Sequence, residues 1–331
     1  MLSNILKSNQ PFVIILILIF GVGFWVYSFI DPIGIAIPAD NINMPFYDFI
    51  ASYIQHNSFF AILITFLLVL LQAFLLVQFN KKYIIINYRT YLPAFFYIVI
   101  ASSFIQLHRL NPVIIGTLFV FTAINFIFST YRSDYALNKL YLAGFLIALA
   151  SFFWGPFAIF FIIIWISLSI LRPFIGREWI VGVLGFLTPY LFVFVYFFVF
   201  LKEDELTRIT HYFISNFELI KPFYSLHYSY YIFYGFLSLL IIVASYVIVS
   251  NYQKKKIKTR KYLEINWWLF VISLGLFVIF RNVTYEIIYI ISIPISFLLS
   301  DYFYYSKRNS YLNSILWILL GSLFYIQIIA H

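Results

Sequence analysis

The hydrophobic residues of this chain are gathered into long apolar runs, which short clusters of charged residues, Pro and Asn separate. A helix that crosses a hydrocarbon core of about 30 Å needs about 20 apolar residues, close to the length of most of these runs. The pattern therefore predicts an all-α, polytopic transmembrane helix bundle of about eleven helices. The predicted spans are 12–29, 58–79, 91–107, 112–129, 138–152, 154–172, 178–200, 230–250, 265–280, 284–304 and 311–329.

Two consecutive spans differ from the others. The run 138–152 is short, and only Phe153, Trp154, Gly155 and Pro156 separate it from the body of the run 154–172. This pair is predicted either to cross the membrane as two helices or to form a broken or re-entrant hairpin. The whole chain, 1–331, is expected to form a single integral membrane domain. Its longer loops are 31–57 and 202–229 on the outside, and the basic loop 251–264 on the cytoplasmic side.

The basic residues between the runs decide the orientation, because an error of one helix would invert every later loop. With the N-terminus in the cytoplasm and the C-terminus outside, the inner loops hold most of the Lys and Arg residues. The outside then keeps only Arg109, Lys202, Arg208, Lys221 and Arg281. The acidic residues divide the other way. Heavy use of Phe, Ile, Tyr, Asn and Lys is typical of an AT-rich bacterial genome, so the predicted location is the bacterial inner (cytoplasmic) membrane.

The composition excludes several classes of protein. Hydrophobic residues make up 64% of the chain and charged residues only 10%, whereas soluble domains carry about 25% charged residues. The net charge of +9 comes from short clusters between apolar runs, so membrane lipids and not nucleic acid are the expected partners. The basic loop 251–264 is expected to contact anionic lipid. A chain without cysteine has no disulfide, thiolate zinc site or cysteine nucleophile.

Carboxylates in the first outer loop are the first candidates for chemistry. Asp31, Asp40 and Asp48 could supply a general base, or oxygen ligands for a divalent cation as cofactor. Acidic residues also keep such loops soluble, and that alternative stays open for each of the three.

Basic residues at the outer boundary are the second group of candidates. His108 and Arg109 lie in a very short outer turn, where Arg109 could bind a phosphate and His108 could pair with an acid. Arg281 opens the tenth span from the outside and is a further candidate for phosphate binding. The alternatives are that Arg109 only extends towards lipid headgroups, and that Arg281 forms a salt bridge with Glu286.

One resemblance is carried by the middle of the chain. Arg172-Pro173-Phe174 and Arg177-Glu178-Trp179, followed by Gly185 and Thr188-Pro189-Tyr190, resemble an uncharacterised family of polytopic inner-membrane proteins of Bacteroidota-type bacteria. That family has no established activity to transfer. The resemblance supports the predicted membrane topology and location.

A more distant likeness bears on mechanism. The stretch from Tyr141 to Ser151 is similar to the Gly- and Ala-rich middle helix of membrane glycosyltransferases of the GT-C fold, and Tyr285 to Ser300 resembles their late helix. The likeness implies an acid in the first outer loop, at Asp31, Asp40 or Asp48, that acts on the acceptor or a metal. It also implies that Arg281 or Arg109 holds the phosphate of a polyprenyl-linked sugar. The chain departs from this pattern in lacking an adjacent acidic pair and a large outer domain.

Three functions follow as expectations. The first is a GT-C-like glycosyltransferase, or a protein that handles a polyprenyl-phosphate-linked glycan in the cell envelope. The second is a non-enzymatic scaffold or assembly subunit with membrane protein partners, which the lack of a strong catalytic motif favours. The third is a lipid flippase or transporter, although ionisable residues are scarce inside the spans.

Overall fold

The computed structural model describes most of the chain, and over that part it is helical with no strand. The residues it describes are 2–8, 10–31, 46–47, 49–50, 58–86, 89–133, 135–200, 207, 210–211, 213–214, 217, 227–280, 283–306 and 309–329. The α-helices are α1 (Leu2–Lys7), α2 (Pro11–Ile30), α4 (Ser58–Tyr83), α5 (Leu92–Ala101), α6 (Pro112–Phe128), α7 (Leu137–Ser151), α8 (Ile162–Leu171), α9 (Gly176–Phe200), α11 (Tyr228–Ser250), α12 (Ile257–Ile279), α13 (Ile288–Tyr305) and α14 (Asn309–Ile329). Short 3-10 helices are η1 (Ile105–Leu107), η2 (Gly155–Phe161), η3 (Tyr252–Lys254) and η4 (Tyr285–Ile287).

Each predicted run coincides with helical structure. Among the described residues, seven helices are long and apolar enough to cross a membrane: α2, α4, α9, α11, α12, the segment Tyr285–Tyr305, and α14. Four shorter apolar helices occupy the remaining runs, at Leu92–Ala101, Pro112–Phe128, Leu137–Ser151 and Gly155–Leu171. The prediction of an all-helical, multi-pass membrane protein is confirmed, whereas eleven complete crossings remain a prediction.

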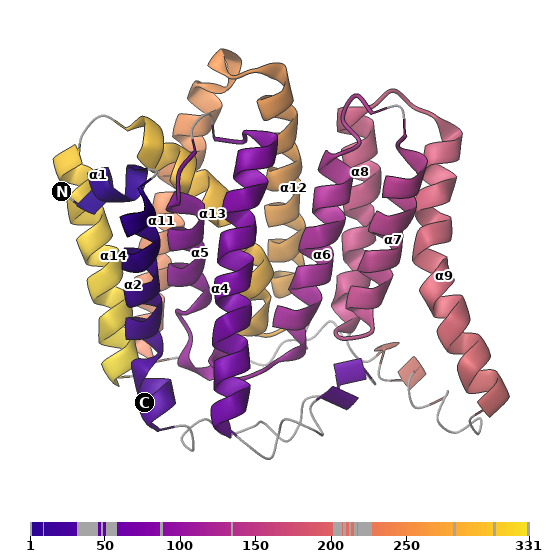
Figure 1. Ribbon diagram of the computed structural model, residues 1–331, viewed down its shortest axis with the longest axis horizontal. Helices are drawn as coiled ribbons and strands as arrows, with labels where there is room; N and C mark the ends of the chain where they lie inside the picture. Colours follow the sequence, from indigo (N-terminus) through magenta and orange to yellow (C-terminus); the bar gives the residue numbers. More distant parts are fainter. Residues whose placement is uncertain are drawn as a thin grey trace.

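The helices stand side by side, and α13 occupies the centre of the bundle (Figure 1). It packs against α5, α6, α11 and α12. Every residue of α13 from Ile288 to Phe303 is buried, as expected of a helix that is surrounded by other helices and is apolar on all sides. The N-terminal helix α1 and the last residues of α14 lie at opposite ends of the bundle (Figure 1).

Helix α9 lies at the edge of the bundle and packs tightly on α7. A Cβ atom added to Gly144 would lie 2.3 Å from the carbonyl oxygen of Gly182, and one added to Gly185 would lie 2.1 Å from that of Tyr141. The two backbones approach this closely because both helices carry Gly at the crossing, a common device for packing helices in lipid. Beyond Pro189, α9 leans away from α7 (Figure 1).

The two breaks in the helical pattern are both buried. Helix α7 ends at Ser151, a turn follows, and the 3-10 helix η2 leads into α8. Pro156 stands at the start of η2 and has no amide hydrogen, so it cannot continue the hydrogen bonding of α7. The helix ends before it, and the chain reverses direction into α8. The predicted span 91–107 is wrong at its end, since α5 stops at Ala101 and an irregular segment, 102–111, runs from there to α6.

Candidate functional site

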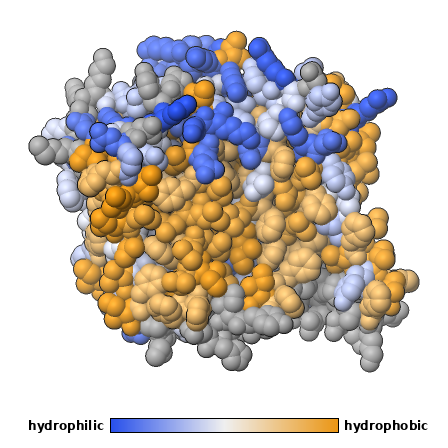
Figure 2. All heavy atoms as spheres, in the orientation of Figure 1, coloured by the Kyte–Doolittle hydropathy of each residue, from blue (hydrophilic) through white to orange (hydrophobic). Residues whose placement is uncertain are grey.

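One end of the bundle is basic. Figure 2 shows hydrophilic residues gathered at the end that holds α1, above a broad apolar belt. Apart from Arg109, every Lys and Arg that the structure describes belongs to α1 or to the helix ends and connections on the side of α1: Lys7, Lys81, Lys82, Arg89, Arg132, Lys139, Arg172, Arg177, Lys254, Lys255, Lys256, Lys258, Arg260 and Lys261. We call this end the basic face.

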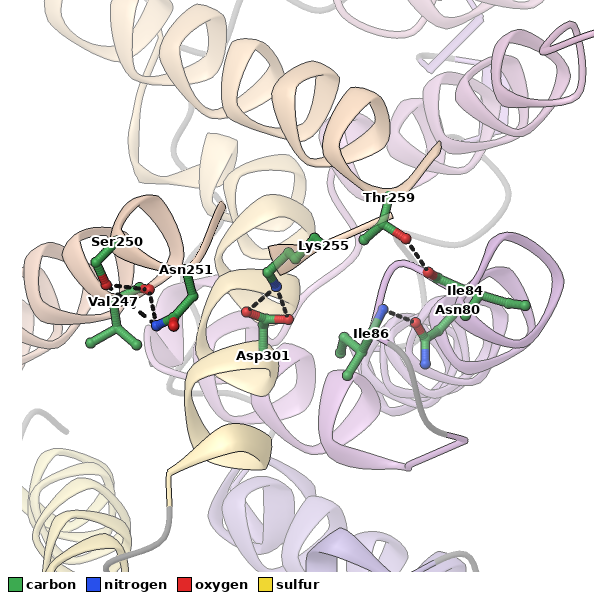
Figure 3. A network of polar contacts seen from close by, with 9 residues as sticks. All are labelled: Asn80, Ile84, Ile86, Val247, Ser250, Asn251, Lys255, Thr259 and Asp301. Carbon is green, nitrogen blue, oxygen red and sulfur yellow. Dashed lines mark hydrogen bonds and ion pairs between the residues drawn. The ribbon is translucent and has the colours of Figure 1, made fainter. Parts of the chain in front are cut away.

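Two ion pairs stabilise the basic face. Arg172 pairs with Glu178 at 2.9 Å and also donates to the carbonyl oxygens of Thr130 and Ser133, at 2.7 and 2.6 Å. The Nζ atom of Lys255 lies 2.5 and 2.6 Å from the two carboxylate oxygens of Asp301 (Figure 3). Both pairs join neighbouring helix ends, so their evident role is structural.

A turn at the end of α4 is held in the same way. Ile84 has a φ of 56°, a strained value for a β-branched residue. The Asn80 side chain accepts from the amide of Ile86 at 2.9 Å, and Thr259 donates to the carbonyl oxygen of Ile84 at 3.1 Å (Figure 3). These bonds pair backbone groups of the turn after α4, and the second one links α4 to α12.

The irregular segment 102–111 lies nearer the opposite end of the bundle and is almost entirely buried. Backbone that is not helical at membrane depth is tolerated only when protein groups satisfy its polar atoms. Here they do: Gln327 donates to the carbonyl oxygen of Ser102 at 2.9 Å, Tyr289 to that of Leu107 at 2.7 Å, and Tyr47 to that of Leu110 at 2.7 Å.

His108 is the centre of this segment. Its ring stacks on Trp25 with 3.9 Å between centroids, and its Nδ1 atom lies 2.7 Å from the Ser28 hydroxyl. Its Nε2 atom lies 3.3 Å from the carbonyl oxygen of Ser102. The imidazole is fully buried and both nitrogens have partners. We therefore assign His108 to anchoring the segment against α2, and leave phosphate binding to Arg109.

The contact between Ser28 and His108 places the end of α2 beside the irregular segment, so two predicted site residues lie at the same end of the bundle. Asp31 follows Ser28 by three residues, just past the last turn of α2, and is exposed. Asp31 is the C-cap of α2 and has already left the helical conformation, with φ −121° and ψ 77°. Arg109 directly follows His108. A carboxylate and a guanidinium from distant parts of the sequence thus lie at the same end of the bundle.

Glu286 is the residue that the sequence did not mark as part of this site. It lies in η4, at the start of the central helix, and its carboxylate interacts electrostatically with Arg109. The sequence placed it at the outer boundary, but only as a salt-bridge partner of Arg281. The candidate site therefore consists of Asp31, Arg109 and Glu286, from α2, the irregular segment and η4.

Three predicted site residues, Asp40, Asp48 and Arg281, lie outside the described residues. Among the residues that the structure describes, no three His, Cys, Asp or Glu side chains are grouped as a metal site would require. The divalent cation expected from the sequence therefore remains a prediction.

The fold and the site define a multi-pass α-helical membrane protein whose charged groups are divided between the two ends of its bundle. The chain belongs to the family of unknown function DUF6427, which it matches over residues 1–331. No curated protein and no solved structure matches it. The similarity to membrane glycosyltransferases of the GT-C fold therefore remains a prediction from the sequence.

Proposed function

We propose that this protein handles a polyprenyl-phosphate-linked glycan at the outer face of the bacterial inner membrane, as a GT-C-like glycosyltransferase. The observation that carries the proposal is the electrostatic interaction of Arg109 with Glu286 at the end of the bundle opposite the basic face, where α2 also ends at Asp31. This end of the bundle offers a cation for a phosphate and a carboxylate for an acceptor.

The proposed orientation follows from the charge on the two ends. Basic loops are retained in the cytoplasm, so the basic face is cytoplasmic and carries α1. The C-terminal end of α14 is then outside, because it lies at the opposite end of the bundle (Figure 1). Asp31, Arg109 and Glu286 lie on that outer side, where lipid-linked sugars are used in envelope assembly.

Each residue has a definite role in the proposal. The guanidinium of Arg109 presents paired N–H groups that match two phosphate oxygens and stabilise the charge of the leaving phosphate. The carboxylate of Asp31 accepts the proton of the acceptor hydroxyl as that oxygen attacks the sugar. Glu286 has the role of positioning Arg109, with which it interacts electrostatically. No step depends on a metal.

The experiment is mass spectrometry of polyprenyl-linked sugars in cells that lack the protein and in complemented strains. We expect linked sugars to accumulate in the deletion strain and in strains carrying Arg109→Gln, Asp31→Asn or Asp40→Asn. The wild type and Arg177→Gln should restore the normal pool. Arg177→Gln is the matched control, because it removes the same charge from an exposed position on the basic face. An unchanged pool in the deletion strain would refute the proposal.

A second candidate is an assembly subunit of an envelope membrane complex, and the outer half of α9 favours it. From Leu191 to Phe200 this helix exposes large side chains in most directions, among them Phe192, Phe198 and Phe200. A photo-crosslinking residue at Phe198 should then capture a protein, whereas one at Ile242, an equally lipid-facing position on α11, should not. Equal crosslinking at both positions would argue against a partner on α9.

A further inference from the structure

We propose that the basic face holds a binding site for the phosphate headgroup of an anionic phospholipid. The site is formed where α4, the connection between α6 and α7, and the start of α12 meet. Four cations surround a cluster of aromatic rings there. The cations are Lys82, Arg132, Lys258 and Lys261, and the rings are Tyr83, Phe128, Tyr131 and Tyr262.

Tyr262 is the centre of the aromatic cluster. Its ring stacks on Phe128 with 4.3 Å between centroids, and the rings of Tyr83 and Tyr131 meet it edge-on at 5.5 and 6.0 Å. Its hydroxyl donates to the carbonyl oxygen of Phe128 at 3.0 Å. These contacts join three separate segments of the chain into one rigid base.

Each cation lies against a ring of this base. Lys258 is 5.6 Å from the centroid of Tyr262, while Lys261 and Arg132 are 5.8 and 5.5 Å from that of Tyr131. Lys82 is 5.0 Å from that of Tyr83. A ring face attracts a cation without neutralising it, so the side chains are positioned while their charge is retained for a ligand.

The turn that carries Arg132 is preorganised. Arg132 has a φ of 53°, a left-handed value that costs energy for a residue other than Gly. Lys139 donates to the carbonyl oxygen of Ser129 at 2.9 Å, and Arg172 donates to those of Thr130 and Ser133. These bonds hold the strained turn in place, and strain of this kind is characteristic of binding sites.

Within the described part of the chain, none of the four cations forms an ion pair. The two ion pairs there use Arg172 and Lys255 instead. The cluster therefore presents several positive charges in a small area. A phosphodiester, whose two charged oxygens can accept hydrogen bonds from different cations, complements them.

The depth of the cluster indicates a lipid as the source of that phosphate. About two helical turns beyond Lys261, α12 exposes Trp267 and Trp268, with 40% and 44% of their surfaces accessible. Exposed Trp residues mark the boundary between headgroups and acyl chains. A ligand with an anionic head on the cluster and an apolar tail along α12 satisfies both features.

The test is native mass spectrometry of the full-length protein in detergent, with phosphatidylglycerol, phosphatidylcholine and soluble glycerol phosphate as separate ligands. We expect phosphatidylglycerol to bind best. Lys258→Gln/Lys261→Gln should weaken its binding about tenfold or more, because each basic residue near a lipid surface contributes appreciably to anionic lipid affinity. Lys254→Gln/Lys256→Gln removes the same charge from the same loop outside the cluster and should change binding less than threefold, or about 0.6 kcal/mol.

Three outcomes would overturn the proposal. Equal losses in the two double variants would show diffuse attraction to the basic face and no defined site. Equal binding of phosphatidylcholine would show that the charge is irrelevant, and equal binding of glycerol phosphate would show a site for phosphate alone. Thermal unfolding of each variant shows whether it is folded, and Tyr262→Phe, which keeps the ring, should retain lipid binding.

Discussion

Lys255, in the connection before α12, reaches across to Asp301 on the central helix and places its Nζ atom against both carboxylate oxygens, at 2.5 and 2.6 Å. Only 8% and 4% of the two side chains are exposed. Each charge has therefore lost most of its water and is stabilised by the opposite charge of its partner. The Lys255 ammonium also lies 5.3 Å from the ring centroid of Tyr305. This pair fixes the loop between α11 and α12 onto the end of α13.

Breaking that pair should destabilise the protein strongly. Asp301→Asn leaves the Lys255 ammonium buried without its counter-charge, a change that typically costs about 3–5 kcal/mol. We expect a clear fall in the midpoint of thermal unfolding in detergent. Lys255→Met/Asp301→Leu removes both charges and should recover most of the loss. If Asp301→Asn unfolds at the wild-type temperature, the pair does not hold the loop.

The crossing of α7 and α9 should tolerate no added side chain. Gly185→Ala places a methyl group where the Tyr141 carbonyl oxygen already lies, so the helices must separate, at a cost of about 1–3 kcal/mol. Gly275→Ala on α12 meets nothing within 4 Å and should be neutral or stabilise by up to about 1 kcal/mol. Thermal unfolding of the two variants gives the comparison. Similar midpoints would contradict the close packing.

Gln72 joins helices α4, α5 and α6 by hydrogen bonds. Its Nε2 donates to the carbonyl oxygen of Ile114 at 2.7 Å, and its Oε1 accepts from the hydroxyl of Tyr97. Gln72→Leu leaves the buried Tyr97 hydroxyl without this acceptor and removes the bond to Ile114, and should cost about 1–3 kcal/mol. Gln72→Leu/Tyr97→Phe also removes the Tyr97 hydroxyl and should be more stable than the single variant. A less stable double variant would mean that the bond contributes little.

Stability should depend on pH through Lys7. Burial lowers the pKa of Lys7 from its ordinary value of 10.5, because the ammonium loses hydration. Between the lowered pKa and 10.5 the unfolded chain binds more protons than the folded one, so stability rises with pH across that window. Wild type should therefore gain stability relative to Lys7→Met as the pH rises towards 10.5. A constant difference between the two proteins would exclude this effect.

The absence of cysteine allows a direct test of the proposed orientation. In intact cells, a membrane-impermeant maleimide should label Tyr228→Cys, at the outer start of α11, and should not label Lys256→Cys on the basic face; both positions are exposed. After permeabilisation both should react. The reverse pattern would place the N-terminus outside.

The sequence alone determined the membrane class and the separation of charge along the chain. A helix in lipid must satisfy its own backbone hydrogen bonds, so its presence depends on a local run of apolar residues that can be read directly. This is why α2, α4, α11 and α14 appear close to their predicted positions. The turn at His108 and Arg109 was predicted, but the irregular stretch 102–107 was missed because its apolar residues continue the preceding run.

Only the tertiary structure decided which polar groups meet. The link between Ser28 and His108, the proximity of Arg109 to Glu286, and the aromatic base around Tyr262 each join residues from separate helices. Such contacts depend on which helices are neighbours and how far each is rotated. In a chain whose helices are apolar on nearly every side, hydrophobicity carries little information about either. Packing between small residues and hydrogen bonds between helices make that choice, and they exist only once the bundle has formed.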